Sequence, residues 1–245
     1  MKAFASDFDG TFYFVDQKEP IKQCDIEAIG ELQSKGYLFG FCTGRPIYGV
    51  LDYLDNQVMA DFYITNSGAT IHDKNLNLIY EKIIPRDIAC TLISYGLEHH
   101  YAVDFHMDGK FYAYGKATNF IKDIIYSLDD LNGNVHNITY FAITEENAEE
   151  LAKLVNQRFG NQVSVFRNKE YVDIVPFECS KGFGIDFIKN TFEIDTFIGI
   201  GDSMNDLPMI EKVDYAYTFP YAPKALQEKS KQIVNSVAEA IHSMV

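Results

Sequence analysis

The chain has 245 residues, a hydrophobic fraction of 47% and a charged fraction of 23%, a composition that predicts a globular protein with a buried core. Its formal net charge of −14 argues against partners held by bulk electrostatics, such as nucleic acid or an anionic membrane. No cysteine pair has C-x-x-C spacing, and no segment resembles a signal peptide or a transmembrane span. We therefore expect a reduced, cytoplasmic compartment, no nucleic-acid partner and no membrane partner.

The first third of the chain predicts alternating strands and helices. The expected elements, in order, are a strand at Lys2–Ser6, a helix from an N-cap at Asp25 to Ser34, a strand at Tyr37–Cys42, a helix to about Leu54 and a strand at Phe62–Thr65. This β-α-β-α-β order predicts a parallel sheet with right-handed crossovers.

The middle of the chain has a different pattern. Helices are expected at Pro85–Glu98, Ile121–Leu128 and Glu145–Phe159, and strands at Tyr101–Phe105, Lys110–Tyr114, Ile138–Ile143, Val163–Arg167 and Tyr171–Val175. Turns at Met107-Asp108-Gly109 and Asn168-Lys169 favour antiparallel hairpins. We expect an α+β domain over residues 82–178, inserted into a core formed by residues 1–81 and 179–245.

The last part returns to the first pattern. A helix at Lys181–Asn190, a strand at Thr196–Ile200, a short helix at Leu207–Glu211, a strand at Tyr215–Tyr217 and a closing helix at Ala238–Met244 are expected. The predicted fold class is α/β: a Rossmann-like parallel sheet with helices on both faces, plus the inserted α+β domain.

The segment Asp7-Phe8-Asp9-Gly10-Thr11 follows the first predicted strand and places two carboxylates two residues apart. In an extended segment such side chains point the same way, so both can face one point. A carboxylate pair can bind a divalent cation, or divide the work of nucleophile and acid/base. Gly10 permits a sharp turn that offers backbone N–H groups to an anion. Surface turns also contain Asp and Gly, so this segment alone does not decide between function and turn.

Three further polar segments support the functional interpretation. Thr43-Gly44-Arg45 and Gly201-Asp202-Ser203-Met204-Asn205-Asp206 follow predicted parallel strands, and Ser180-Lys181-Gly182 opens a helix where the chain leaves the inserted domain. Singly they are compatible with a helix entry, an acidic capping loop and a surface lysine. Ligands of open parallel sheets bind at the carboxyl ends of strands, so together the segments predict one shared site.

These four segments resemble the four motifs of the haloacid dehalogenase superfamily, in the large-cap subclass often called Cof-type phosphatases. The similarity spans the whole chain and includes Ile64-Thr65-Asn66-Ser67-Gly68-Ala69, which resembles the segment preceding the cap. The chain departs from the usual pattern at Tyr217-Thr218-Phe219-Pro220-Tyr221-Ala222-Pro223 and at Asn235-Ser236-Val237. A relation to the sugar-phosphate or phosphomannomutase-like branches therefore stays open.

The resemblance implies phosphoryl transfer from a small phosphorylated metabolite to Asp7, with Asp9 as general acid and then general base. It implies a Mg²⁺ ion held by Asp7, the Asp9 carbonyl and Asp202, with Ser203 or Asp206 orienting these ligands. The substrate phosphate would be bound by the Phe8 backbone, Thr43, Gly44, Lys181 and Asn205.

The inserted domain would act as a cap that excludes water and contacts the substrate. Tyr112, Tyr114 and Arg167 are candidate contacts, whereas His99, His100 and His106 are expected in surface or packing roles. The alternatives are a phosphomutase that uses the same intermediate, and a non-catalytic metabolite-binding protein. A calcium-binding module is disfavoured, because the acidic loop lacks the Glu that completes an EF-hand. The sequence does not predict the oligomeric state.

Overall fold

The computed structural model describes residues 1–116 and 123–244, and an eight-stranded sheet unites the two ends of the chain. Its strands, in spatial order, are β14 (Gln232–Ile233), β13 (Tyr215–Thr218), β12 (Thr196–Ile200), β1 (Lys2–Ser6), β2 (Leu38–Cys42), β3 (Phe62–Thr65), β4 (Thr70–Asp73) and β5 (Leu78–Glu81). Pairing is parallel from β14 to β3 and antiparallel from β3 to β5. The predicted parallel core is confirmed, with β4 and β5 as an antiparallel extension.

Helices cover both faces of this sheet, as the α/β prediction requires. On one face lie α1 (Gln23–Ser34), α2 (Ile47–Leu54) and α8 (Val237–His242), and on the other α5 (Lys181–Thr191), α6 (Leu207–Ile210) and α7 (Lys224–Lys229). Strand β2 shows why: Phe39 and Phe41 pack in the cluster that includes α1 and α8, whereas Cys42 packs in the cluster that includes α5 and α6. A strand covered on both faces is apolar on both, which explains its continuous run of apolar residues.

The N-cap assignment of Asp25 is wrong. Helix α1 begins at Gln23 with Lys22 as its N-cap, and Asp25 lies in the first turn. The Asp25 Oδ1 atom instead accepts a hydrogen bond of 2.7 Å from the backbone N–H of Ala238, at the start of α8. Asp25 therefore satisfies a backbone donor at the end of a helix 213 residues away in the chain.

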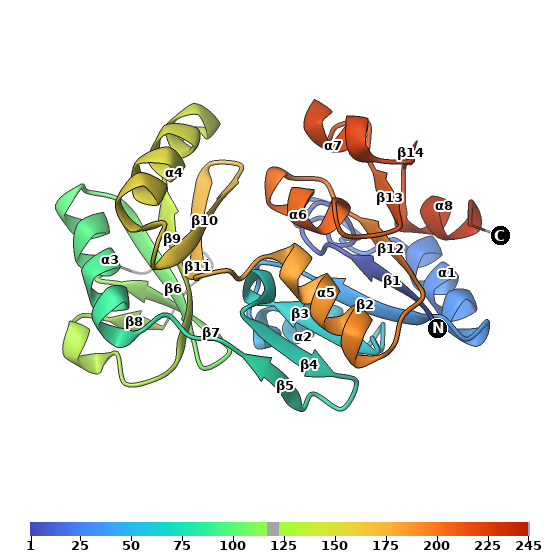
Figure 1. Cartoon of the computed structure of the whole chain (residues 1–245), viewed down its shortest axis with the longest axis horizontal. Coiled ribbons are helices and arrows are strands. Elements are labelled where there is room, and N and C mark those ends of the chain that lie inside the picture. Colours follow the sequence, from blue (N-terminus) through green and yellow to red (C-terminus); the bar gives the residue numbers. More distant parts are fainter. Residues whose placement is uncertain (117–122, 245) are drawn as a thin grey trace.

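The middle of the chain forms a second sheet, of six strands, that shares no strand with the first. Its order is β10 (Val163–Asn168), β11 (Tyr171–Pro176), β9 (Val135–Phe141), β6 (Ala102–Met107), β7 (Lys110–Tyr114) and β8 (Ile124–Ile125). All pairs are antiparallel except β7–β8, and the hairpin β10–β11 is confirmed. Helices α3 (Arg86–Glu98) and α4 (Glu145–Phe159) pack on the face away from the first sheet (Figure 1).

The helix expected at Ile121–Leu128 is absent from the described part of that segment, which instead holds strand β8 and the start of a 3₁₀ turn at Leu128–Asp130. Ile121 lies outside the described residues. The β-branched pair Ile124–Ile125 extends the sheet beside β7, so tertiary pairing overrides the local helical pattern. The short elements β5, α7 and β14 were not predicted.

The uncovered face of the six-stranded sheet is turned toward the carboxyl ends of the parallel strands. Between them lies a cavity of about 1520 Å³, lined by residues of both sheets. None of the helices among the described residues is long and apolar enough to span a bilayer.

Candidate active site

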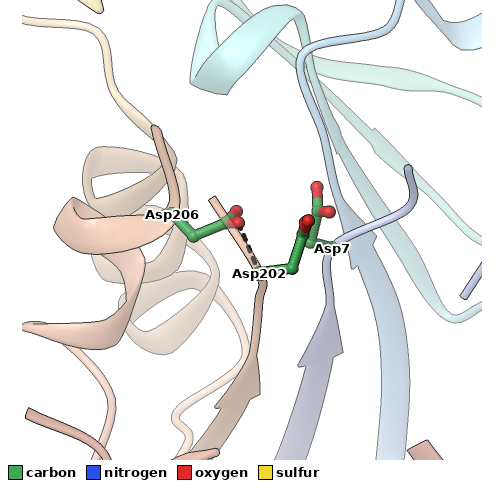
Figure 2. Close-up of side chains that lie close together, drawn as sticks. All are labelled: Asp7, Asp202 and Asp206. Carbon is green, nitrogen blue, oxygen red and sulfur yellow. Dashed lines mark hydrogen bonds between the residues drawn. The ribbon is translucent and has the colours of Figure 1, made fainter. Parts of the chain in front are cut away.

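Two buried carboxylates stand side by side at the carboxyl ends of adjacent parallel strands. Asp7 follows β1, Asp202 follows β12 just after Gly201, and each is 4% exposed. Asp7 N–H donates to the Ile200 carbonyl at 2.9 Å, which holds the two strand ends together. Asp206, three residues into the next turn, points at them, and oxygen atoms of all three carboxylates lie within 4.8 Å of one another (Figure 2).

Lys181 is the cation of this cluster and is 2% exposed. Ser180 is the N-cap of α5, with its Oγ accepting from the Phe183 N–H at 3.0 Å, so Lys181 begins the helix beneath the carboxylates. Its Nζ donates to Asp7 Oδ1 at 2.6 Å and to Asp206 Oδ1 at 2.5 Å. Burial opposes a charge on Lys181, yet the carboxylates of Asp206 and Asp7 more than offset this and raise its pKa.

Asp206 fixes the loop that carries Asp202. Its Oδ2 accepts from the backbone N–H groups of Asp202 and Ser203, both at 2.9 Å, and its Oδ1 accepts from Lys181. Ser203 and Asp206 also form a capping box around the 3₁₀ turn η3 (Met204–Asp206). Because both oxygens of Asp206 are used within the protein, Asp7 and Asp202 have more freedom to bind an ion directly.

The charge balance of the cluster favours a bound cation. Three carboxylates share one buried ammonium group. Burial, followed by repulsion from Asp206, raises the pKa of Asp7 well above its usual value and raises that of Asp202 in the same way. A hard divalent ion takes carboxylate oxygens as ligands and would relieve this repulsion. The donor set therefore fits Mg²⁺.

Asp9 lies at the mouth of the site rather than in the buried cluster, and its side chain is 48% exposed. Arg45 holds it in a bidentate pair, with Nε to Oδ2 and Nη2 to Oδ1 both at 2.6 Å. Arg45 is fixed in turn by the Gly49 carbonyl at 3.0 Å and by the ring of Tyr53, whose centroid is 4.4 Å away. The sequence placed Arg45 in a motif but gave it no role.

The turn after Asp9 packs closely against Asp202. Gly10 has a φ of +81°, and a Cβ at this position would lie 2.7 Å from Asp202 Oδ2. Only glycine both tolerates this φ and leaves room for the carboxylate. Tyr221 donates from its hydroxyl to the Gly10 carbonyl at 2.7 Å. Tyr221 belongs to the segment that departs from the usual motif pattern, and its side chain lines the cavity.

The proposed phosphate contacts lie around these carboxylates. Thr43, Gly44 and Asn205 line the cavity, as do Asp7, Asp9, Asp202 and Ser203. The Phe8 ring is buried against Tyr13 and Phe41, so only its backbone is available to a ligand. Lys181 does not line the cavity but reaches the site through Asp7.

The six-stranded sheet contributes its own side chains to the cavity. Lys169, in the β10–β11 turn, places Nζ 3.6 Å from Asp202 Oδ2 and so joins the two sheets. Arg167 lines the cavity as expected, paired with Glu145 and Glu149 on α4. No sequence motif contains Lys169, and its direction depends on hairpin geometry.

The predictions for Tyr112, Tyr114 and His106 of the cap are corrected, and that for His99 is kept. Tyr112 and Tyr114 pack against the apolar cluster of the second sheet and do not line the cavity. His106 does line it, with Nδ1 2.8 Å from the Oδ1 of Asn66, in the 3₁₀ turn η1 (Asn66–Gly68) that follows β3. His99 Nδ1 lies 2.8 Å from the Tyr95 carbonyl at the end of α3, the local packing role expected of it.

Comparisons with known proteins show the family and the fold. Residues 4–242 match the model of the haloacid dehalogenase-like hydrolase family. The 5-amino-6-(5-phospho-D-ribitylamino)uracil phosphatase of Bacillus subtilis is 26% identical, over 96% of this chain and 93% of that protein.

Two solved structures share the fold. A haloacid dehalogenase-like hydrolase from Bacteroides thetaiotaomicron aligns with a TM-score of 0.83 at 19% identity, over 100% of this chain and 99% of the other. A sugar phosphatase of HAD subclass IIB aligns with a TM-score of 0.82 at 22% identity, over 100% and 98%. With a family match that covers nearly the whole sequence, the chain belongs to the haloacid dehalogenase-like hydrolases, in the Cof-type branch whose relatives are phosphatases.

Proposed function

We propose that this protein is a Mg²⁺-dependent phosphatase that hydrolyses a small phosphorylated metabolite, such as a sugar phosphate, through an aspartyl-phosphate on Asp7. The observation that carries this proposal is the buried Asp7 carboxylate, which shares Lys181 with Asp206 and opens into the cavity. The sugar phosphatase with the same fold and the B. subtilis phosphatase support a phosphate monoester as substrate.

In this mechanism Asp7 attacks the phosphorus through the oxygen that Lys181 does not bind. Lys181 accounts for Oδ1, at 2.6 Å, and leaves Oδ2 for the nucleophilic role. The bond from phosphorus to the leaving oxygen breaks as the Asp7–phosphorus bond forms, and water later cleaves the aspartyl-phosphate. Thr43, the Gly44 N–H and Asn205 would donate to the phosphoryl oxygens, where fixed donors stabilise the transition state best.

Asp9 would protonate the leaving oxygen and then take a proton from the attacking water. Its pair with Arg45 fixes the direction of its carboxylate at the mouth of the site. The pair occupies both oxygens, so Asp9 would have to release one of the two Arg45 contacts to carry the proton that it donates. We propose Arg45 as a positioning residue, since a bidentate fork restricts rotation of a carboxylate better than a single bond.

A Mg²⁺ ion would be held by Asp7, the Asp9 carbonyl and Asp202, with Asp206 and Ser203 shaping the loop. When bound, it would offset the repulsion between the carboxylate nucleophile and the phosphate. We further propose that residues 82–178 act as the cap, with residues 1–81 and 179–245 as the catalytic core. The cavity between the two sheets would then be the substrate chamber.

The direct test is release of inorganic phosphate from p-nitrophenyl phosphate by the purified protein, with Mg²⁺ or with EDTA. We expect turnover only with Mg²⁺, and without a bisphosphate activator, which a phosphomutase would need. Phosphate release that persists in EDTA would contradict the metal dependence. Absence of turnover on this ester and on a panel of phosphorylated metabolites would favour the non-catalytic alternative.

A further inference from the structure

Three polar side chains form a row across the six-stranded sheet. Asp104 on β6 is the register partner of Thr139 on β9, which in turn is the partner of Asp173 on β11. All three line the cavity. The alternate residues on the same strands belong to the apolar cluster beneath α3 and α4, namely Val103, Phe105, Ile138, Tyr140, Val172 and Ile174. Because neighbouring strand residues point to opposite faces, the row faces the proposed chemistry.

The row is rich in hydrogen-bond acceptors. The Thr139 Oγ1 atom lies 2.8 Å from Asp173 Oδ1 and 2.9 Å from Asn137 Oδ1. Its hydroxyl has one proton, so it can donate to only one of these two acceptors at a time. Asp173 Oδ2 lies 3.8 Å from the point where a Cβ on Gly44 would stand, so this carboxylate borders the proposed phosphate loop. Among the described residues no group donates a hydrogen bond to the Asp104 carboxylate, and burial raises its pKa to about 6.

A buried donor beside the row also lacks a partner. Asn137 lies two residues before Thr139 on the same face of β9 and is 0% exposed. Its Nδ2 has no hydrogen-bond partner within the described part of the chain. Unpaired polar groups in a closed site cost free energy unless a ligand or ordered water supplies the missing bonds. The row therefore has unused hydrogen-bonding capacity at the cavity, whereas the unpaired Asn137 donor is fully buried and does not line it.

The cations of the cavity are committed elsewhere. Arg45 pairs with Asp9, Arg167 with Glu145 and Glu149, and Lys169 with Asp202. The remaining lining lysine, Lys116, is exposed at the end of β7. Within the described residues, none of these four cations is hydrogen-bonded to the row. A second anionic group on a substrate would thus meet two carboxylates without a dedicated counter-ion.

Apolar surface flanks the row on one side. The rings of Phe141 and Tyr171 lie at the cavity with centroids 5.2 Å apart. Carboxylates beside an aromatic surface suit a ligand that has hydroxyl or ammonium donors on one side and a C–H face on the other.

We infer that Asp104, Thr139 and Asp173 bind the leaving alcohol, and that the enzyme selects phosphate monoesters whose leaving group donates hydrogen bonds through hydroxyl or ammonium groups and carries no second anion. Asp104 is the residue that sets this selection, because its carboxylate has no protein partner to share it. The inference rests on the proposed phosphatase function and specifies its substrate class.

Three esters with one hexose skeleton test the inference: glucosamine 6-phosphate, glucose 6-phosphate and 6-phosphogluconate. Glucosamine 6-phosphate carries an ammonium group, 6-phosphogluconate a carboxylate, and glucose 6-phosphate neither. Because 6-phosphogluconate is also an open chain, the comparison of wild type with Asp104→Asn separates the effect of charge from that of shape. We would measure kcat/KM for each and the inhibition constant of each against p-nitrophenyl phosphate, so that binding is read even without turnover. We expect the wild type to favour glucosamine 6-phosphate over 6-phosphogluconate by about tenfold or more, the size of one unscreened charge contact.

The variant Asp104→Asn keeps the shape and removes the charge. We expect it to reduce the preference for glucosamine 6-phosphate over 6-phosphogluconate by about tenfold. Asp104 is part-exposed and unpartnered, so its replacement orphans no buried group. The matched control is Glu150→Gln, which removes the same charge from an exposed position on α4 outside the cavity and should leave the preference unchanged.

Failure of the inference is distinct from failure of the phosphatase proposal. Turnover of p-nitrophenyl phosphate with equal affinity for the three hexose esters, or a preference that Asp104→Asn leaves unchanged, would overturn the inference alone. No Mg²⁺-dependent turnover of any ester would overturn both.

Discussion

The core and cap walls of the cavity differ in how their polar groups are satisfied. On the core side, the oxygens of Asp206 and one oxygen of Asp7 are already hydrogen-bonded to Lys181 or to backbone N–H groups at 2.5–2.9 Å. On the cap side, the Asp104 carboxylate has no hydrogen-bond partner among the described residues. A preassembled network suits bond-breaking chemistry, which needs fixed charges, whereas unpaired groups suit recognition of a variable ligand.

The largest effect should come from removing the nucleophile on the core side. Asp7→Asn keeps the shape and the Lys181 contact but lacks a nucleophilic carboxylate, so we expect kcat to fall by about a thousandfold or more. Steady-state kinetics on p-nitrophenyl phosphate would measure this, with circular dichroism and thermal melting to confirm the fold. Activity near that of the wild type would rule out an aspartyl-phosphate at this position.

Replacing Lys181 tests how much the buried ion-pair network contributes to the stability of the protein. Lys181→Met leaves Asp7 and Asp206 buried without their shared cation, so we expect the free energy of unfolding to fall by about 3–5 kcal/mol. Urea denaturation would measure it. The control Lys189→Met, on the same helix in a more exposed pair with Asp214, should cost about 1 kcal/mol or less. Similar losses in the two variants would show that burial of Lys181 has no special energetic role.

Metal binding sharpens the comparison further. If Mg²⁺ relieves repulsion among the core carboxylates, it should stabilise the wild type by about 2.7 kcal/mol at a concentration one hundred times its Kd. Asp202→Asn should remove most of this stabilisation, and the control Asp186→Asn on α5 should keep it. Thermal melting in Mg²⁺ and in EDTA measures this stabilisation and does not depend on enzymatic activity. An equal Mg²⁺ shift in Asp202→Asn would place the ion elsewhere.

Arg45 lies on the core wall, and its replacement tests the positioning of Asp9. Arg45→Lys keeps the charge but loses the bidentate fork, so we expect kcat to fall by about tenfold while KM changes less. The control is Arg158→Lys. Arg158 lies over the ring of Tyr95, away from the cavity, so this variant should leave kcat unchanged. A change confined to KM would instead indicate that Arg45 binds substrate.

The last prediction concerns stability rather than turnover, at the contact of His106 with Asn66. Burial lowers the pKa of His106 to about 3, so the folded protein holds it neutral where the unfolded chain protonates it. The unfolded state then binds more protons below about pH 6.5, and this group makes stability fall as pH falls, by at most about 1.4 kcal/mol per pH unit.

His106→Gln keeps a side chain able to donate to Asn66 but does not titrate. We expect the variant to lose less stability than the wild type between pH 7 and pH 5, as measured by urea denaturation at each pH. Parallel pH profiles for the two proteins would show that His106 is not protonated on unfolding.

The sequence by itself determined the chemistry-bearing segments and their order. Strands at Lys2–Ser6 and Thr196–Ile200 were predicted with the bounds observed, since continuous apolar runs bounded by Asp and Gly leave little local ambiguity. The rule that ligands bind at the carboxyl ends of parallel strands then predicted that Asp7 and Asp202 would lie together.

Only the tertiary structure decided which partner each polar group has. Asp25 binds a helix end 213 residues away, Arg45 binds Asp9, and Lys169 reaches Asp202 from a hairpin turn. The row of Asp104, Thr139 and Asp173 depends on the register of the strands, because a slip of one residue would turn these side chains to the opposite face of the sheet. Local sequence fixes backbone propensity, but hydrogen bonds and ion pairs between distant segments depend on distances that exist only after the two sheets have formed and packed.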